Sequence, residues 1–160
     1  MLLALVLGIL LVVTFFAVPC EAAGDSRSPA ATPSIWPVAG AVTSGFGWRL
    51  SPIEGSHEWH QGIDIAAETG TPVVSAANGH VLQSGWTEGY GYIVQIDHGS
   101  GLTTVYGHNS AVTVRPGEKV RMGQVIAYAG STGRSTGPHL HYEVRLSNTA
   151  VDPWPYLIAY

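Results

Sequence analysis

The chain has little cysteine, little charge and no long helical pattern, and each of these features excludes a class of protein. Its single cysteine, Cys20, stands at the end of an apolar first segment, so the rest of the chain has no thiol for a disulfide or a cysteine protease. Only 11% of the 160 residues are charged, the net charge is −4, and no run of Lys or Arg follows the first segment. Nucleic acid is therefore not an expected partner.

The first segment, residues 1–19, is apolar almost throughout and carries no Lys or Arg. An apolar stretch followed by small residues predicts an export signal over residues 1–23. Two alternatives stay open. Residues 1–19 could attach the protein to a membrane as an uncleaved anchor, since about 18 apolar residues reach the lower limit for spanning a bilayer, and Cys20 could carry a lipid. All three place the rest of the chain outside the cytoplasm, in the cell envelope, the periplasm or the medium.

The remainder of the sequence predicts a linker followed by one domain. Residues 24–34 are dominated by Ser, Pro, Ala and Thr, a composition typical of a flexible linker. Residues 35–160 are long enough for one domain with its own hydrophobic core. We expect this domain to be a monomer.

The domain sequence predicts an antiparallel, all-β fold. The chain contains 20 glycines, which punctuate short β-rich runs, and no stretch after the first segment keeps a helical period. The predicted strands are Val81–Gln83, Tyr92–Asp97, Leu102–Tyr106, Gln124–Ala129 and His139–Arg145. A hairpin loop is expected at His98–Gly101 and a turn at Arg115–Glu118, and the aromatic end Val151–Ile158 is expected to lie against the barrel.

Two short histidine clusters indicate the chemistry of the domain, and the first spans residues 60–65. On a strand, alternate side chains point to opposite faces, so His60, Gly62 and Asp64 would share one face and the isoleucines at 63 and 65 would enter the core. Gly62 would leave room for an ion between its neighbours. The sequence therefore predicts one strand through this cluster, with a polar face.

The second cluster follows the same alternation. His139, His141 and Glu143 would share a face, with apolar residues between them. Imidazole nitrogen and carboxylate oxygen are ordinary zinc ligands, and three protein ligands leave a fourth position for water, as in catalytic zinc sites. His60 and Asp64 could complete such a set with either histidine of the second cluster. Each pair alone is equally well explained by an ion pair or a polar strand face, and it is their joint presence that favours a metal site.

The other histidines divide by position. His108 follows Tyr106–Gly107 at a predicted strand end, where functional sites gather. His57, His80 and His98 lie in polar or turn-like stretches and are predicted to be solvated or structural. Near a metal, one neutral histidine could accept a proton and a second could stabilise an oxyanion, so the residues suffice for a peptide hydrolase.

At these residues the chain resembles the lysostaphin-type, or LytM-like, zinc endopeptidases that cut peptides of bacterial peptidoglycan. The matching motifs run from Thr43–Arg49 through His60–Asp64, Thr71–Val74 and Tyr106–His108 to Gly130–Arg145. The resemblance implies an antiparallel β-sandwich of barrel-like shape, of the duplicated hybrid motif type, with a substrate groove over the central sheet.

The same resemblance implies the roles of five residues. His60, Asp64 and His141 would bind zinc, and His108 and His139 would be the catalytic pair. We assign the general base to His139 and stabilisation of the oxyanion to His108.

The resemblance also implies a peptidoglycan peptide as the substrate. Gly85–Gly91 and Gly130–Gly137 are candidates for the walls of the groove, although plain turns explain them equally well. Individual substrate-binding residues are not identified by the sequence. The rival functions are a non-catalytic regulator that activates a cell-wall amidase and a module that binds peptidoglycan without cutting it. A regulator would be expected to lack one or more of the five site residues, and all five are present.

Overall fold

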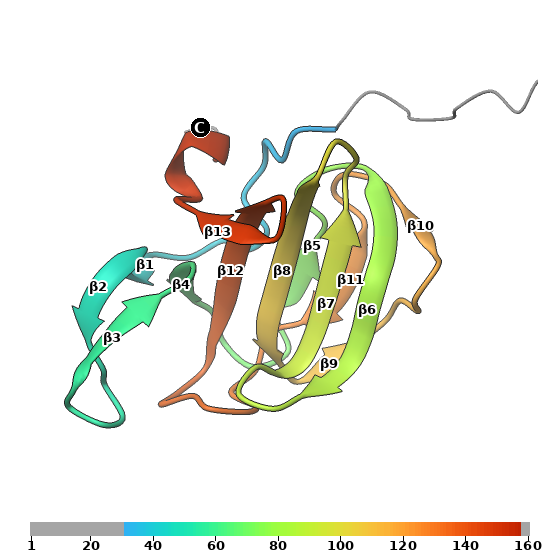
Figure 1. Ribbon diagram of the computed structural model, residues 1–160. Coiled ribbons are helices and arrows are strands. Elements are labelled where there is room, and N and C mark those ends of the chain that lie inside the picture. The colour runs from blue at the N-terminus through green and yellow to red at the C-terminus, as the bar shows by residue number, and fades with distance from the viewer. Residues whose placement is uncertain (1–30, 158–160) are drawn as a thin grey trace, which may run out of the picture.

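An eight-stranded antiparallel sheet is the main element of the computed structural model, which describes residues 31–157. Its strands lie in the order β1-β4-β12-β8-β7-β6-β10, and β13 pairs with β12. The bounds are β1 Val42–Ser44, β4 Ile63–Ala66, β6 Gly79–Thr87, β7 Gly91–Asp97, β8 Leu102–Asn109, β10 Lys119–Val120, β12 His139–Leu146 and β13 Thr149–Val151. Figure 1 shows β12 and β8 side by side in the middle of this sheet.

Two smaller antiparallel sheets complete the fold. Strands β5 (Pro72–Val74), β11 (Val125–Tyr128) and β9 (Ala111–Val112) lie behind the main sheet, whereas the hairpin of β2 (Gly47–Leu50) and β3 (His57–His60) stands to one side of it (Figure 1). The predicted signal or anchor, residues 1–23, and residues 24–30 of the predicted linker lie outside the described residues. Between residues 31 and 157, no helix is long and apolar enough to cross a membrane.

The core lies between the main sheet and the three-stranded sheet, and strand alternation decides what enters it. Ile63 and Ile65 of β4, with Leu140 and Tyr142 of β12, are fully buried in one cluster that also holds Ile126 of β11. The residues between them in sequence point to the other face of the main sheet. The expected antiparallel β-sandwich is confirmed, and its outer face carries the polar side chains of the two histidine clusters.

The five predicted strands are present within a few residues of their expected bounds. The hairpin loop at 98–101 and the turn at Arg115–Glu118 are also confirmed, the latter by a hydrogen bond from the Glu118 amide to the Arg115 carbonyl at 3.1 Å. The single strand expected through His60 and Asp64 is wrong. Strand β3 ends at His60, β4 begins at Ile63, and the two intervening residues turn the chain from the hairpin into the main sheet.

The expectation that Gly62 leaves room for an ion is also wrong. A Cβ at this position would collide with the carbonyl oxygen of Tyr142 and lie 2.9 Å from Cγ of Glu143. Glycine is required here because the β3–β4 connection lies directly on the backbone of β12.

Both ends of the described chain contact the domain. The amides of Ala31 and Ser34, in the predicted linker, donate to the carbonyls of His98 and Ala76 at 3.0 and 3.1 Å. The C-terminal segment pairs β13 with β12, continues through a short 3₁₀ helix at Trp154–Tyr156 and buries Leu157. The prediction that this end lies against the barrel is confirmed as far as Leu157, and Ile158 lies outside the described residues.

Candidate metal centre and active site

Three side chains bring their donor atoms together on the outer face of the main sheet. His60 ends β3, Asp64 lies in β4, and His141 lies directly opposite Asp64 in β12. Oδ1 of Asp64 is 2.9 Å from Nδ1 of His141 and 3.2 Å from Nε2 of His60, and the two histidine nitrogens are 3.0 Å apart. Within residues 31–157 this is the one group of three such donors gathered closely enough for a single ion.

The donor set fits zinc. In a tetrahedral site with metal–ligand bonds of about 2.1 Å, the ligand atoms lie about 3.4 Å from one another. The distances between the three donor atoms here are only a few tenths of an ångström shorter. Two imidazole nitrogens and one carboxylate oxygen form a common catalytic zinc set, which leaves a fourth position open.

Each donor is held by a second contact through its other polar atom. These contacts are His60 Nδ1–H to the Gly45 carbonyl (2.7 Å), Arg49 Nη1–H to Asp64 Oδ2 (2.7 Å) and His141 Nε2 with Glu143 Oε1 (2.9 Å). Such outer contacts fix the orientation of a ligand and raise its affinity for a metal. The three donor atoms are therefore directed at one point by the surrounding chain.

The electrostatics of the cluster favour a cation. Burial alone would raise the pKa of Asp64, but hydrogen bonds with His141 and His60 hold it well below its usual range. Burial alone would lower the pKa of His141, but hydrogen bonds with Asp64 and Glu143 raise it to about 9. The two buried carboxylates thus stabilise positive charge at this place, which a divalent ion supplies.

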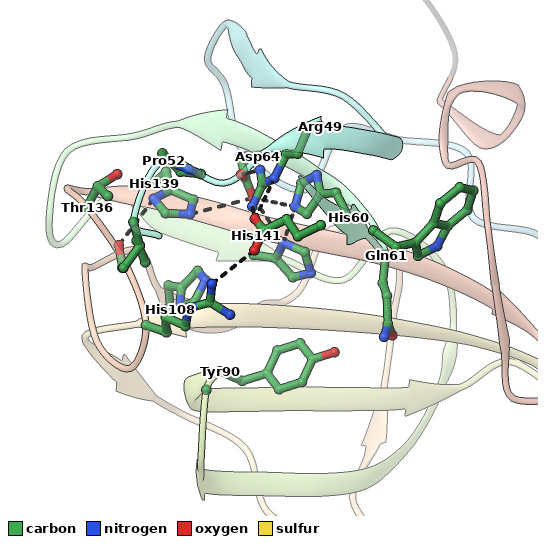
Figure 2. Close-up of a pocket in the computed structure, with 16 residues that line it drawn as sticks. Arg49, Pro52, His60, Gln61, Asp64, Tyr90, His108, Thr136, His139 and His141 are labelled. Carbon is green, nitrogen blue, oxygen red and sulfur yellow. Dashed lines mark hydrogen bonds and ion pairs between the residues drawn. The ribbon is translucent and has the colours of Figure 1, made fainter. Parts of the chain in front are cut away.

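Two further histidines face the cluster, as Figure 2 shows. His108 lies next to the last residue of β8, and its Nδ1–H donates to the Thr132 carbonyl at 2.8 Å. His139 begins β12, and its Nδ1–H donates to the Gly137 carbonyl, also at 2.8 Å. The two ring centroids are 4.8 Å apart. In both rings Nε2 is left for the pocket, and that of His139 lies 3.6 Å from Oδ1 of Asp64.

His108 is held in an unusual state. Its φ of 61° is in the left-handed region, which is uncommon for residues other than glycine and is often found at functional sites. Burial, together with the charge of His141, lowers the pKa of His108 to about 4. With Nδ1–H bound to Thr132, the neutral ring presents a lone pair on Nε2.

A pocket opens over these residues. Its walls come from the β2–β3 hairpin and from both glycine-rich segments named above, through Gly89 and Tyr90 of the first and residues 134–136 of the second. Arg134 joins two of the walls by ion pairs to Glu54 and Glu58, each at 3.0 Å. Trp59 also lines the pocket and adds a half-exposed aromatic surface.

The structure places all five predicted site residues around this pocket (Figure 2). His57 and His80 are exposed, and neither lines it. His98 is buried between β7 and β8, where Nδ1–H donates to the Asn78 carbonyl at 2.7 Å and Nε2 lies 2.7 Å from Oγ1 of Thr104. These three agree with the solvated or structural role predicted for them.

Sequence reasoning missed the residues that support the ligands. Arg49 reaches Asp64 across the β2–β3 hairpin, and Tyr90 and Arg145 both bind the carboxylate of Glu143. The predicted alternation placed Glu143 on one face with His139 and His141, although without a role, and Arg145 continues the same two-residue alternation, so the spacing could have indicated Arg145. No sequence pattern indicated Arg49 or Tyr90, because their partners Asp64 and Glu143 lie 15 and 53 residues away in the chain.

Comparison with known proteins agrees with this geometry. Residues 58–153 match the family model described as Peptidase family M23. Over 112 residues, 70% of the chain, the sequence is 48% identical to the DD-carboxypeptidase/endopeptidase Mpg of Neisseria meningitidis, and over 124 residues, 78% of the chain, it is 39% identical to the murein hydrolase activator EnvC of Escherichia coli. These matches cover only 26% and 29% of the two relatives.

Solved structures show the same likeness. A zinc-containing peptidase from Vibrio cholerae superimposes with a TM-score of 0.70 and 39% identity, over 76% of the chain and 39% of the peptidase. The catalytic domain of lysostaphin from Staphylococcus simulans superimposes with a TM-score of 0.67 and 34% identity, over 72% of the chain and 90% of that domain. The chain belongs to peptidase family M23, in its lysostaphin-type, LytM-like form.

Proposed function

We propose that the protein is a zinc-dependent endopeptidase that hydrolyses peptide bonds in the cross-links or stem peptides of bacterial peptidoglycan. The observation that carries this proposal is the meeting of five residues in one pocket: the donors His60, Asp64 and His141, and the proton-handling pair His108 and His139. The M23 relatives named as peptidases support it.

Zinc would be held by His60, Asp64 and His141, and when bound it supplies Lewis-acid chemistry by polarising a carbonyl and lowering the pKa of water to about 7. His139 accepts a proton from the attacking water at Nε2, because its Nδ1 proton is occupied by the Gly137 carbonyl. The protonated ring then returns that proton to the leaving nitrogen.

His108 faces the same space and is proposed to stabilise the oxyanion. For this it must donate a hydrogen bond from Nε2, so the ring must gain a proton there or transfer its Nδ1 proton away from Thr132. The lowered pKa opposes a permanent charge on this ring. A proton on Nε2 of His108 is therefore needed only while negative charge develops beside it.

The predicted organisation of the chain agrees with such a substrate. We propose that residues 1–23 direct the protein out of the cytoplasm or anchor it, that residues 24–34 link this segment to the domain, and that residues 35–160 act in the cell envelope. The relative EnvC, which is named as an activator of murein hydrolases, supports this location.

A second candidate is a regulator of cell-wall amidases, which the 39% identity to the activator EnvC favours. A regulator needs no metal ligands or proton-handling residues. The set of five in one pocket argues for catalysis.

The test is to incubate the purified protein with peptidoglycan, with and without a zinc chelator, and to identify released fragments by mass spectrometry. New peptide ends that appear only with zinc would establish the endopeptidase and the bond it cuts. A folded, zinc-loaded protein that releases nothing alone but increases cleavage by an added amidase would replace this proposal with the regulator.

A further inference from the structure

His141 must present an unprotonated Nδ1 to the metal, and its neighbour Asp64 opposes this. A metal is bound by the neutral imidazole, which carries one proton, on either Nδ1 or Nε2. Oδ1 of Asp64 lies 2.9 Å from Nδ1 and draws the proton to that nitrogen. The tautomer that can bind a metal therefore requires a stronger acceptor on the opposite side of the ring.

Glu143 supplies that acceptor. Its Oε1 lies 2.9 Å from Nε2 of His141, and an ionised carboxylate can only accept hydrogen bonds. The side chain is fully buried, so its charge must be stabilised within the protein. Tyr90 donates to the same oxygen at 2.7 Å, and Arg145 Nε donates to Oε2 at 2.6 Å.

The three donors keep Glu143 ionised. Arg145 Nε forms an ion pair with Oε2 at 2.6 Å, and this positive charge stabilises the carboxylate form in the interior. Arg145 also contacts the Tyr90 hydroxyl at 3.1 Å, so the two donors brace each other. An ionised, acceptor-only group is thereby maintained at one place in the interior.

Glu143 has no path to the substrate. It does not line the pocket, and the β3–β4 connection covers it at Gly62, where a Cβ would lie only 2.9 Å from Cγ of Glu143. It is therefore a positioning residue, which acts through His141.

We propose that the Glu143 carboxylate, held by Tyr90 and Arg145, fixes the proton of His141 on Nε2 and so presents Nδ1 to the metal. This inference rests on the proposed zinc site and goes beyond it by assigning a buried network to the choice of tautomer. The β12 alternation makes this arrangement possible, because His141, Glu143 and Arg145 follow one another at every second residue on one face.

The test compares Glu143→Gln with the wild type in the full protein. Zinc affinity is measured by competition with a chromophoric chelator, and exchange of the His141 Nε2 proton with solvent by ¹⁵N–¹H spectroscopy of the zinc-loaded protein. We expect Glu143→Gln to weaken zinc binding about 10–100-fold, as for other outer-shell carboxylates, and to accelerate exchange of the Nε2 proton. Glu118→Gln makes the same chemical change on an exposed turn and should leave both unchanged.

The outcomes separate the inference from the proposed function. Suppose that the wild type binds zinc and cuts peptidoglycan. If Glu143→Gln then binds zinc within twofold of the wild-type affinity and exchanges the Nε2 proton at the same rate, the inference is overturned and the proposed function stands. A wild type that binds no zinc overturns the proposed site itself. If Glu143→Gln does not fold, Tyr90→Phe removes one donor and keeps the charge. We then expect Tyr90→Phe to bind zinc about fivefold more weakly than the wild type. An unchanged zinc affinity of this variant would overturn the inference.

Discussion

His139 and His141 lie two residues apart on one face of β12, yet their ring nitrogens have different partners. Nδ1 of His141 faces Asp64 and His60, whereas Nδ1 of His139 is turned to the Gly137 carbonyl. We predict that His141→Ala loses zinc and activity together. His139→Ala should keep most of its zinc and lose about 10²–10⁴-fold in rate, the usual contribution of a general base. Zinc content and peptidoglycan cleavage are measured on the same preparations, and cleavage retained by either variant would contradict the assignment.

Substitutions of His108 can distinguish a hydrogen-bond donor to the oxyanion from a proton acceptor. If it stabilises the oxyanion, His108→Ala should lower kcat about 10²–10³-fold, the cost of losing one oxyanion donor. His108→Gln, which keeps an amide donor, should recover part of that loss. Equal losses in both variants would indicate that the ring acts as a proton acceptor, the state that its Thr132 contact favours at neutral pH.

The connection between β3 and β4 is the element that assembles the metal cluster. It carries His60 on one side and Asp64 on the other, and it packs on β12 at Gly62. We predict that Gly62→Ala destabilises the fold by about 1–3 kcal/mol, because the backbone of β12 cannot move to admit a methyl group. Gly45→Ala has open space around it and should cost less. Urea unfolding with a chelator present measures the stability of both variants. Equal urea midpoints for Gly62→Ala and Gly45→Ala would contradict the close contact between Gly62 and β12.

The hairpin of β7 and β8 contains a histidine that links stability to pH. Burial lowers the pKa of His98 below its ordinary value of 6.5. The contribution of neutral His98 to the free energy of unfolding is therefore complete above pH 6.5. It is lost as pH falls, because the unfolded chain then binds a proton at His98 more readily than the folded chain does. We predict that the free energy of unfolding falls more steeply below pH 6.5 in the wild type than in His98→Gln. Urea titrations from pH 5 to 8 with a chelator compare the slopes, and parallel curves would refute the linkage.

At the scale of the whole molecule, the sequence predicted what depends on alternation. Period-two patterns placed β7, β8 and β12, and they put His139 and His141 on one face. The pattern could not show that β3 and β4 are separate strands, since His60 and Asp64 meet through the turn at Gly62 and not through shared strand geometry. Arg49 was equally hidden, because its contact with Asp64 depends on how the hairpin folds back on the sheet.

The metal cluster lies on the outer face of the main sheet, whereas the hydrophobic core lies on the other face. Zinc should therefore add stability by mass action without being needed for folding, about 2.7 kcal/mol when free zinc is 100 times Kd. We predict that a chelator lowers Tm by roughly 5–15 °C and leaves the β-sheet circular dichroism spectrum unchanged at 25 °C. His141→Ala should show no response to the chelator. Unfolding of the wild type at 25 °C on metal removal would mean that the ion supports the core itself, which the separation of the two faces argues against.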